Sequence, residues 1–227
     1  MLYINKPIFI FTFLILPAIC LGQSKMICDQ AYDGETFYGT KTTNVKAVSQ
    51  LPGKIQHNVN GYLKQALGSI YDSTHFSHGQ IVNLRKNFKH DTAAYRREWV
   101  VPKYELHFLI HDMSLGIKNY YLQLNVDEFG QIISSNWPRR SFSNRQELSQ
   151  FEEIEKLALK IAARKKFDTV GYTVALEYNN KLDRLCWCFY FNHELRAMYK
   201  SYDCILIDWG DHSVINDSMI REVSTEY

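Results

Sequence analysis

The chain has 227 residues, and its 26 Lys and Arg against 24 Asp and Glu give a formal net charge of +2. This near-neutral balance excludes the strong basic excess that is typical of nucleic-acid-binding proteins. Apolar residues make up 46% of the chain, and a chain of this size buries roughly 70% of its unfolded surface on folding. We therefore expect a folded protein rather than a disordered one.

The first 22 residues have the plan of a secretory signal peptide. Lys6 precedes an apolar stretch from Pro7 to Ile19, in which Thr12 is the only polar residue. A membrane-spanning helix needs roughly 20 apolar residues, whereas this stretch is shorter and Pro17 interrupts its end. We predict cleavage after Gly22 and export of a bacterial protein to the periplasm or the extracellular space, with no membrane contact after cleavage.

Cys20 offers an alternative to this cleavage. A lipoprotein would carry its lipid on that cysteine and stay attached to a membrane. The preceding residue, Ile19, is bulky where the lipoprotein peptidase pattern usually has a small residue. We therefore favour the form that is released from the membrane.

The remaining cysteines favour a disulfide, because an even number of cysteines in a secreted chain usually pairs. Four remain after cleavage: Cys28, Cys186, Cys188 and Cys204. If a hairpin closes around Glu194 and Leu195, position 186 faces about position 203 and lies beside Cys204. We predict a Cys186–Cys204 disulfide. Free buried thiols are the alternative, and a zinc site is disfavoured because Cys-x-Cys in a strand is not the Cys-x-x-Cys loop of structural zinc.

The first half of the chain predicts one helix followed by strands. Residues 23–50 are polar and mixed, so we expect an extended leader with room for one edge strand. Apolar residues then recur every three or four positions, which predicts an amphipathic helix: Ile55, Val59, Leu63, Ala66, Leu67 and Ile70. Ile81 and Val82 mark a first strand candidate. Strict alternation from Tyr104 to Ile110 and from Tyr120 to Val126 predicts antiparallel strands with one buried face.

The second half repeats this order. Ser149 and Glu152 form a capping box at the start of a predicted helix, and Arg164 to Lys166 end it with positive charge, which the helix dipole favours there. An apolar stripe lies between them: Phe151, Ile154, Leu157, Ala158, Ile161 and Ala162. Three strand candidates follow, YTVALEYN, RLCWCFYF and YKSYDCILIDW.

Both halves end their last long strand at an aspartate, in VDEFGQII and in IDWGDHSVI. An aspartate can accept hydrogen bonds from the next amides, and a glycine supplies the positive φ of a tight turn. We therefore predict an α+β fold of two tandem helix-plus-antiparallel-sheet (α-β-β-β) repeats, at residues 51–138 and 146–227. Two independent sets of hairpins are the alternative.

The helix SQFEEIEKLALKIAARKKF, the strand YYLQLNVDEFGQII and the two aspartate–glycine turns resemble the PepSY-like group of exported bacterial domains. A helix across a curved antiparallel sheet is also similar to the cystatin-like layout. The resemblance covers residues 50–135 and 149–220. It implies an exported, non-catalytic domain that binds or inhibits secreted enzymes, and it assigns no site residue to this chain.

Catalytic and metal-binding patterns are absent from the sequence. His107 and His111 lie about 13 Å apart along a strand, and Glu105 with His107 would need further ligands, so we interpret this strand face as a solvent-facing polar strip. His75 and His78 alone make no metal site. No nucleophile elbow, local Cys–His signature or phosphate loop occurs. We expect no enzyme activity, no cofactor and no metal.

Four aromatic residues are the candidate binding residues. Tyr121 and Tyr190 occupy strand faces that we do not assign to the core, and Trp137 and Trp209 lie near strand ends. Because exposed Tyr and Trp often anchor interfaces, we predict a binding module that recognises a protein or peptide, with inhibition as one form of that role. Cover by a second layer is the alternative, and inaccessible tryptophans would remove the motive for the hypothesis. The alternative functions are an envelope structural or assembly component and an unrecognised secreted hydrolase.

Overall fold

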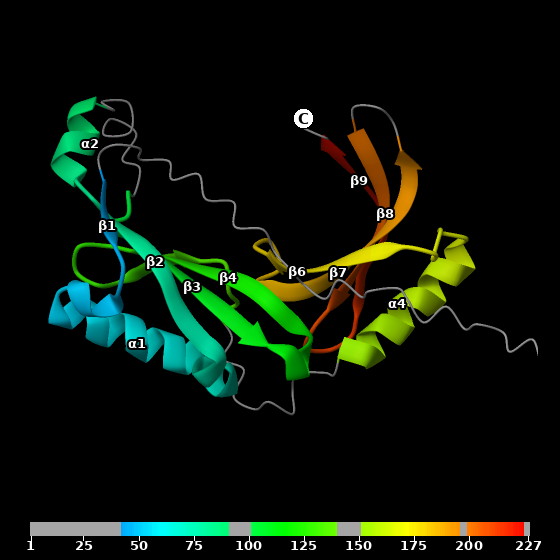
Figure 1. Ribbon diagram of the computed structural model, residues 1–227, viewed down its shortest axis with the longest axis horizontal. Coiled ribbons are helices and arrows are strands. Elements are labelled where there is room, and N and C mark those ends of the chain that lie inside the picture. Colours follow the sequence, from blue (N-terminus) through cyan, green and yellow to red (C-terminus); the bar gives the residue numbers. More distant parts are fainter. Residues whose placement is uncertain (1–41, 91–100, 140–150, 196–198, 225–227) are drawn as a thin grey trace, which may run out of the picture.

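The computed structural model describes residues 42–90, 101–139, 151–195 and 199–224. Within these ranges the protein is an α+β fold with two antiparallel sheets, and a long helix lies against each sheet (Figure 1). The predicted signal peptide, Cys20, Cys28 and Ser149 lie outside the described residues, so the predictions about them stay predictions. No described helix is long and apolar enough to cross a membrane.

The first unit is a five-stranded sheet with the order β1-β2-β3-β4-β5. Its strands are β1 (Thr42–Val45), β2 (Thr74–Val82), β3 (Tyr104–Asp112), β4 (Ile117–Val126) and β5 (Ile132–Ser135). Its helices are η2 (Val48–Gln50), α1 (Gly53–Leu67), η3 (Gly68–Ser73), α2 (Leu84–His90) and η4 (Met113–Leu115). The predicted helix is confirmed in α1, whose apolar side is buried, and β2 begins earlier than expected, so that His75 and His78 lie in a strand.

The second unit is a four-stranded sheet with the order β6-β7-β8-β9. Its elements are α4 (Phe151–Lys165), β6 (Tyr172–Asn179), β7 (Arg184–Leu195), β8 (Tyr199–Asp208) and β9 (Val214–Ser224). The predicted helix is confirmed, with Glu152 and Glu153 in its first turn and Arg164 and Lys165 in its last. Both charge pairs match the dipole of the helix.

In each unit a long helix precedes four strands that pair in chain order, and β1 adds a fifth strand beside β2 in the first unit. This order resembles the predicted α-β-β-β plan with one more strand in each copy. The coarse prediction of an α+β protein with antiparallel sheets is therefore confirmed, whereas the tandem repeat is not.

The two turns that suggested a repeat use the aspartate alike and the glycine differently. Asp127 Oδ1 accepts from the amides of Phe129 at 2.8 Å and Gln131 at 2.7 Å, and Gly130 adopts a φ of 91°. Asp208 Oδ1 accepts from the amides of Gly210 at 2.8 Å and Asp211 at 3.0 Å. The left-handed residue of the second turn is His212, with a φ of 58°, so the predicted role of the glycine is wrong there.

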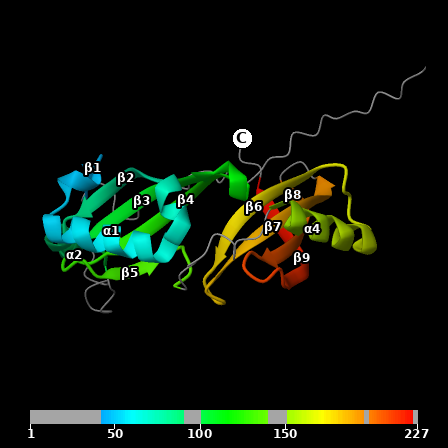
Figure 2. The same cartoon turned by 90° about the horizontal axis from the view of Figure 1, so that it is seen from below.

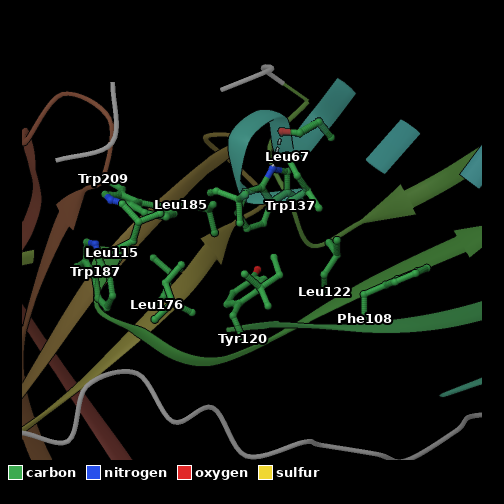
Figure 3. Packing of buried hydrophobic residues seen from close by; sticks show 14 of the residues in the cluster. Leu67, Phe108, Leu115, Tyr120, Leu122, Trp137, Leu176, Leu185, Trp187 and Trp209 are labelled. Atoms are coloured by element: carbon green, nitrogen blue, oxygen red, sulfur yellow. Dashed lines mark hydrogen bonds between the residues drawn. The ribbon is translucent and has the colours of Figure 1, made fainter. Parts of the chain in front are cut away.

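One continuous hydrophobic core joins the units, which lie side by side along the long axis of the molecule (Figure 2). In Figure 3, Tyr120 and Trp137 of the first unit lie beside Leu176 and Leu185 of the second. The backbone is also close-packed at this joint: a Cβ placed on Gly116 would lie 2.7 Å from Cβ of Phe151, the first residue of α4. The two units therefore share part of their hydrophobic stabilisation.

Candidate functional site

The face of the second sheet opposite α4, which we call the outer face, holds the candidate site. Side chains alternate along a strand, so on β7 the rings of Trp187 and Phe189 pack against Phe151 of α4, with centroids 4.9 and 6.1 Å apart. Cys188 and Tyr190 then point to the outer face. One row of β7 side chains thus packs against α4, while the other row, which includes Cys188 and Tyr190, lies on the outer face.

Three strands contribute to a polar cluster on this face: Glu177 from β6, Tyr190 from β7 and Arg221 from β9. Arg221 makes a bidentate ion pair, with Nη1 and Nη2 each donating at 2.8 Å to one oxygen of Glu177. The Tyr190 hydroxyl donates to Glu177 Oε1 and accepts from Arg221 Nη1. Planar, two-point pairing fixes the guanidinium more firmly than a single contact would.

Aromatic rings complete the cluster. Cζ of Arg221 lies 5.4 Å from the centre of the Tyr190 ring, and the ring of Tyr202 packs edge-on against Tyr190 with centroids 5.9 Å apart. Burial, the neighbouring Cys188 and the Glu177 carboxylate raise the pKa of Tyr190, while the bonds to Glu177 raise the pKa of Arg221. At neutral pH the site therefore holds a neutral phenol beside a guanidinium that is paired with a carboxylate.

Apolar side chains extend this surface. Cys188, Cys204 and Leu206 are buried on the outer face, and Tyr190, Tyr202, Ile215 and Met219 pack against them as partly exposed residues. Interface cores are enriched in aromatic residues, Met and Arg relative to the rest of a protein surface. The outer face thus combines buried thiols with partly exposed aromatic and apolar side chains.

Sequence reasoning found Tyr190 but missed Glu177 and Arg221. These two residues are separated by 44 positions, and each reads as an ordinary polar residue in an alternating strand. Only the meander of four strands brings them onto one face.

The structure buries both candidate tryptophans. Trp137 is 1% exposed, and its Nε1 donates to the carbonyl of Ala66 in α1 at 3.1 Å. Trp209 is fully buried, and its ring lies 6.0 Å from that of Trp187. The prediction that they lie exposed on loops is wrong, because the chain turns inward after β5 and after β8 and places both rings in the shared core. Neither of them presents a binding surface in this structure, so the sequence-based motive for a recognition surface at these tryptophans is lost.

Tyr121 lies on the other sheet, across from Leu109 of β3, and it is partly buried there. It occupies the face opposite the core, as predicted, but it belongs to a different surface from Tyr190. The four aromatic candidates therefore do not form one site.

The predicted Cys186–Cys204 disulfide is wrong in register. Position 186 faces Asp208 rather than position 203, and Cys204 faces Tyr190. The cause is that β7 continues to Leu195, with a bulge near Asn192. Cys186, Cys188 and Cys204 are free and buried, and burial raises the pKa of Cys186 to about 12.

The corresponding face of the first sheet carries a row of polar residues with buried oxygens. Gln80, Glu105 and Asn125 lie opposite one another on β2, β3 and β4, and one side-chain oxygen of each is buried without a hydrogen-bond partner. His107 Nε2 lies 3.7 Å from Glu105 Oε1, and the ring of His78 stacks on that of His107 with centroids 4.5 Å apart. The prediction of a solvent-facing strip is wrong here, since Glu105 and His107 are both buried.

In the parts of the chain that the structure describes, no three His, Cys, Asp or Glu residues gather in a way that could hold a metal. Comparisons with known proteins give no match, either to a family model, to a curated protein or to a solved structure. The resemblance to PepSY-like domains therefore stays a prediction.

Proposed function

We propose that the protein is an exported binding module, without catalytic activity of its own, that recognises a protein or peptide through the outer face of the second sheet. The observation that carries this proposal is the gathering of Tyr190, Tyr202 and Arg221 on the face opposite α4. Such side chains are the commonest energetic anchors of interfaces.

Pre-organisation supports the same conclusion. Two hydrogen bonds to the Glu177 carboxylate hold the Arg221 guanidinium. The ring and the hydroxyl of Tyr190 also contact it. Its side chain nevertheless remains 39% exposed. Because the Arg221 side chain is already ordered, little conformational entropy is lost when a partner contacts it, and such losses are a main term opposing binding.

The finer architecture belongs to this proposal. We infer that the two units are copies of one PepSY-like or cystatin-like unit, in which a helix precedes a meander of antiparallel strands. The common element order and the shared aspartate of the two turns support a duplication. In this view the outer face of the second unit diverged toward recognition. The side that faces α4 stayed apolar because it packs in the core.

A peptide library panned against the chain from Gln23 to Tyr227 tests the function. Peptides that bind are expected to lose affinity by about tenfold or more with Tyr202→Ala or Arg221→Gln, because anchor residues contribute over 1 kcal/mol each. Tyr121→Ala, on the outer face of the first sheet, is the matched control and is expected to leave affinity unchanged. Equal losses in all three variants, or none, would refute the proposed face.

A role as an assembly component is the second candidate, because β9 is a long edge strand. It spans Val214–Ser224, and Val214 and Ile220 on it are exposed. Exposed edges with apolar side chains tend to pair with other chains. Light scattering over a concentration series distinguishes the two roles: an oligomer that Ile220→Lys dissociates favours assembly, and a monomer at all concentrations favours the binding module.

A further inference from the structure

Three sulfur-bearing residues meet on the outer face of the second sheet, one from each of three neighbouring strands. Cys188 lies on β7, Cys204 on β8 and Met219 on β9, and we call them the sulfur cluster. Cys204 faces Met219 directly, and Cys188 faces Leu206, two positions along β8 from Cys204. Because residues two apart on a strand share a face, all three side chains lie on the same side of the sheet.

The cluster is compact and dry. Cys188 and Cys204 are fully buried, and Met219 packs against them together with Tyr190 and Tyr202. The thiols of Cys188 and Cys204 interact with each other, and the Cys204 thiol donates to the carbonyl of Tyr202 at 3.6 Å. Two thiols in contact with a thioether at their edge make a set of soft donors from which water is largely excluded.

The strand positions disfavour a disulfide between the two cysteines. Cys188 and Cys204 are diagonal rather than opposite, and diagonal neighbours in a sheet lie about 7–8 Å apart. A disulfide needs Cβ atoms about 3.5–4.5 Å apart. The two sulfurs can therefore approach each other as ligands of one ion more readily than they can bond.

We propose that Cys188, Cys204 and Met219 bind one Cu(I) ion. Thiolate and thioether sulfur select soft monovalent copper over hard cations, and a set of two thiolates and one thioether suits its low coordination number. Binding replaces the two thiol protons, so that one Cu(I) enters and two protons leave. The inference is independent of the proposed recognition of a peptide, since it depends only on the positions of the three sulfurs.

Anaerobic titration of the reduced protein with Cu(I), against a chromophoric Cu(I) chelator, tests the site. One ion per chain is expected, with X-ray absorption showing sulfur neighbours only. Cys188→Ser and Cys204→Ser are expected to abolish this binding. Met219→Leu is expected to weaken it by about 10-fold or more, since loss of even an outer-shell partner of a metal costs on the order of 10- to 100-fold in affinity.

Cys186→Ser is the matched control, since Cys186 is also a buried thiol on the outer face. Met113→Leu, at an exposed methionine, and Cys28→Ser complete the controls, and all three are expected to bind like the parent. Circular dichroism identifies any variant that fails to fold. If a cysteine variant does not fold, the affinity of the folded Met219→Leu variant for Cu(I) decides whether the site exists. Binding that survives both Cys188→Ser and Cys204→Ser, or nitrogen and oxygen neighbours alone, would overturn the proposal. So would a Cys188–Cys204 disulfide in protein isolated without reductant.

Discussion

The first sheet and the second sheet each pack one face against a long helix, and they differ in what the other face carries. On the first sheet that face holds Gln80, Glu105 and Asn125 in one row, with buried oxygens that have no hydrogen-bond partner. On the second it holds tyrosines, thiols and an arginine clamped by a carboxylate. The helix-facing sides must both be apolar to form the shared core, whereas the outer faces are free of that demand and have become chemically distinct.

The joint between the two units is where the largest effect on stability is expected, because packing there makes the two units depend on each other. Trp137→Ala is expected to lower the free energy of unfolding by about 3–5 kcal/mol, the usual effect of removing a buried aromatic side chain. Urea unfolding followed by circular dichroism measures the loss. Both units are expected to unfold in one transition, since Trp137 belongs to the core that they share.

Phe129→Ala, at a side chain that is 61% exposed, is the control for Trp137→Ala. It is expected to change stability by no more than about 0.5 kcal/mol. Two separate transitions in the parent protein would contradict the shared core.

Two glycines give opposite expectations for the same substitution. Gly116 has a φ of 76°, and a Cβ there would meet Phe151 of the second unit at 2.7 Å, so Gly116→Ala is expected to destabilise the protein by about 1–3 kcal/mol. Gly61 lies within α1 with nothing near its Cβ position, so Gly61→Ala is expected to stabilise by about 0.5–1 kcal/mol. Thermal unfolding of both variants checks the pair, and shifts of the same sign would contradict it.

The two aspartate turns sharpen the comparison further. Asp208 is buried and accepts from Arg184 Nη1 at 3.3 Å in addition to its two amides, so Asp208→Ala is expected to cost about 1–3 kcal/mol. Asp127 accepts from two amides at an exposed turn, and Asp127→Ala is expected to cost about 0.5–1.5 kcal/mol. Denaturant midpoints rank the variants. If Asp127→Ala lowered the midpoint more than Asp208→Ala, the first turn would depend more strongly on its aspartate than the second, against this expectation.

The smallest expected effect is a pH dependence of the free energy of unfolding, which arises at the joint between the two units. Asp183 accepts from the Tyr178 hydroxyl at 2.7 Å and from the Arg139 amide at 3.2 Å. Burial and this carboxylate raise the pKa of Tyr178 to about 12 from an ordinary value of 10.0. Since the folded state holds the proton more tightly, this contribution to stability is complete below pH 10 and is lost as the pH rises toward 12.

Absorbance titration of the phenolate, parent minus Tyr178→Phe, measures that pKa. Asp183→Asn is expected to return it toward the ordinary range, and asparagine tolerates the φ of 53° at this position. An unchanged titration in Asp183→Asn would show that burial alone sets the pKa of Tyr178.

The sequence by itself determined the two long helices and the buried sides of the strands. The spacing of Ile55, Val59 and Leu63 and the alternation from Tyr104 to Ile110 are local consequences of helix and strand periodicity. Tertiary structure decided where strand-end residues go, so Trp137 and Trp209 entered a core that no local pattern reveals. It also decided register: β7 continues to Leu195, so that Cys204 faces Tyr190 instead of lying beside Cys186. Register and joint packing depend on contacts between residues far apart in the chain, and for that physical reason the outer-face clusters could be found only in three dimensions.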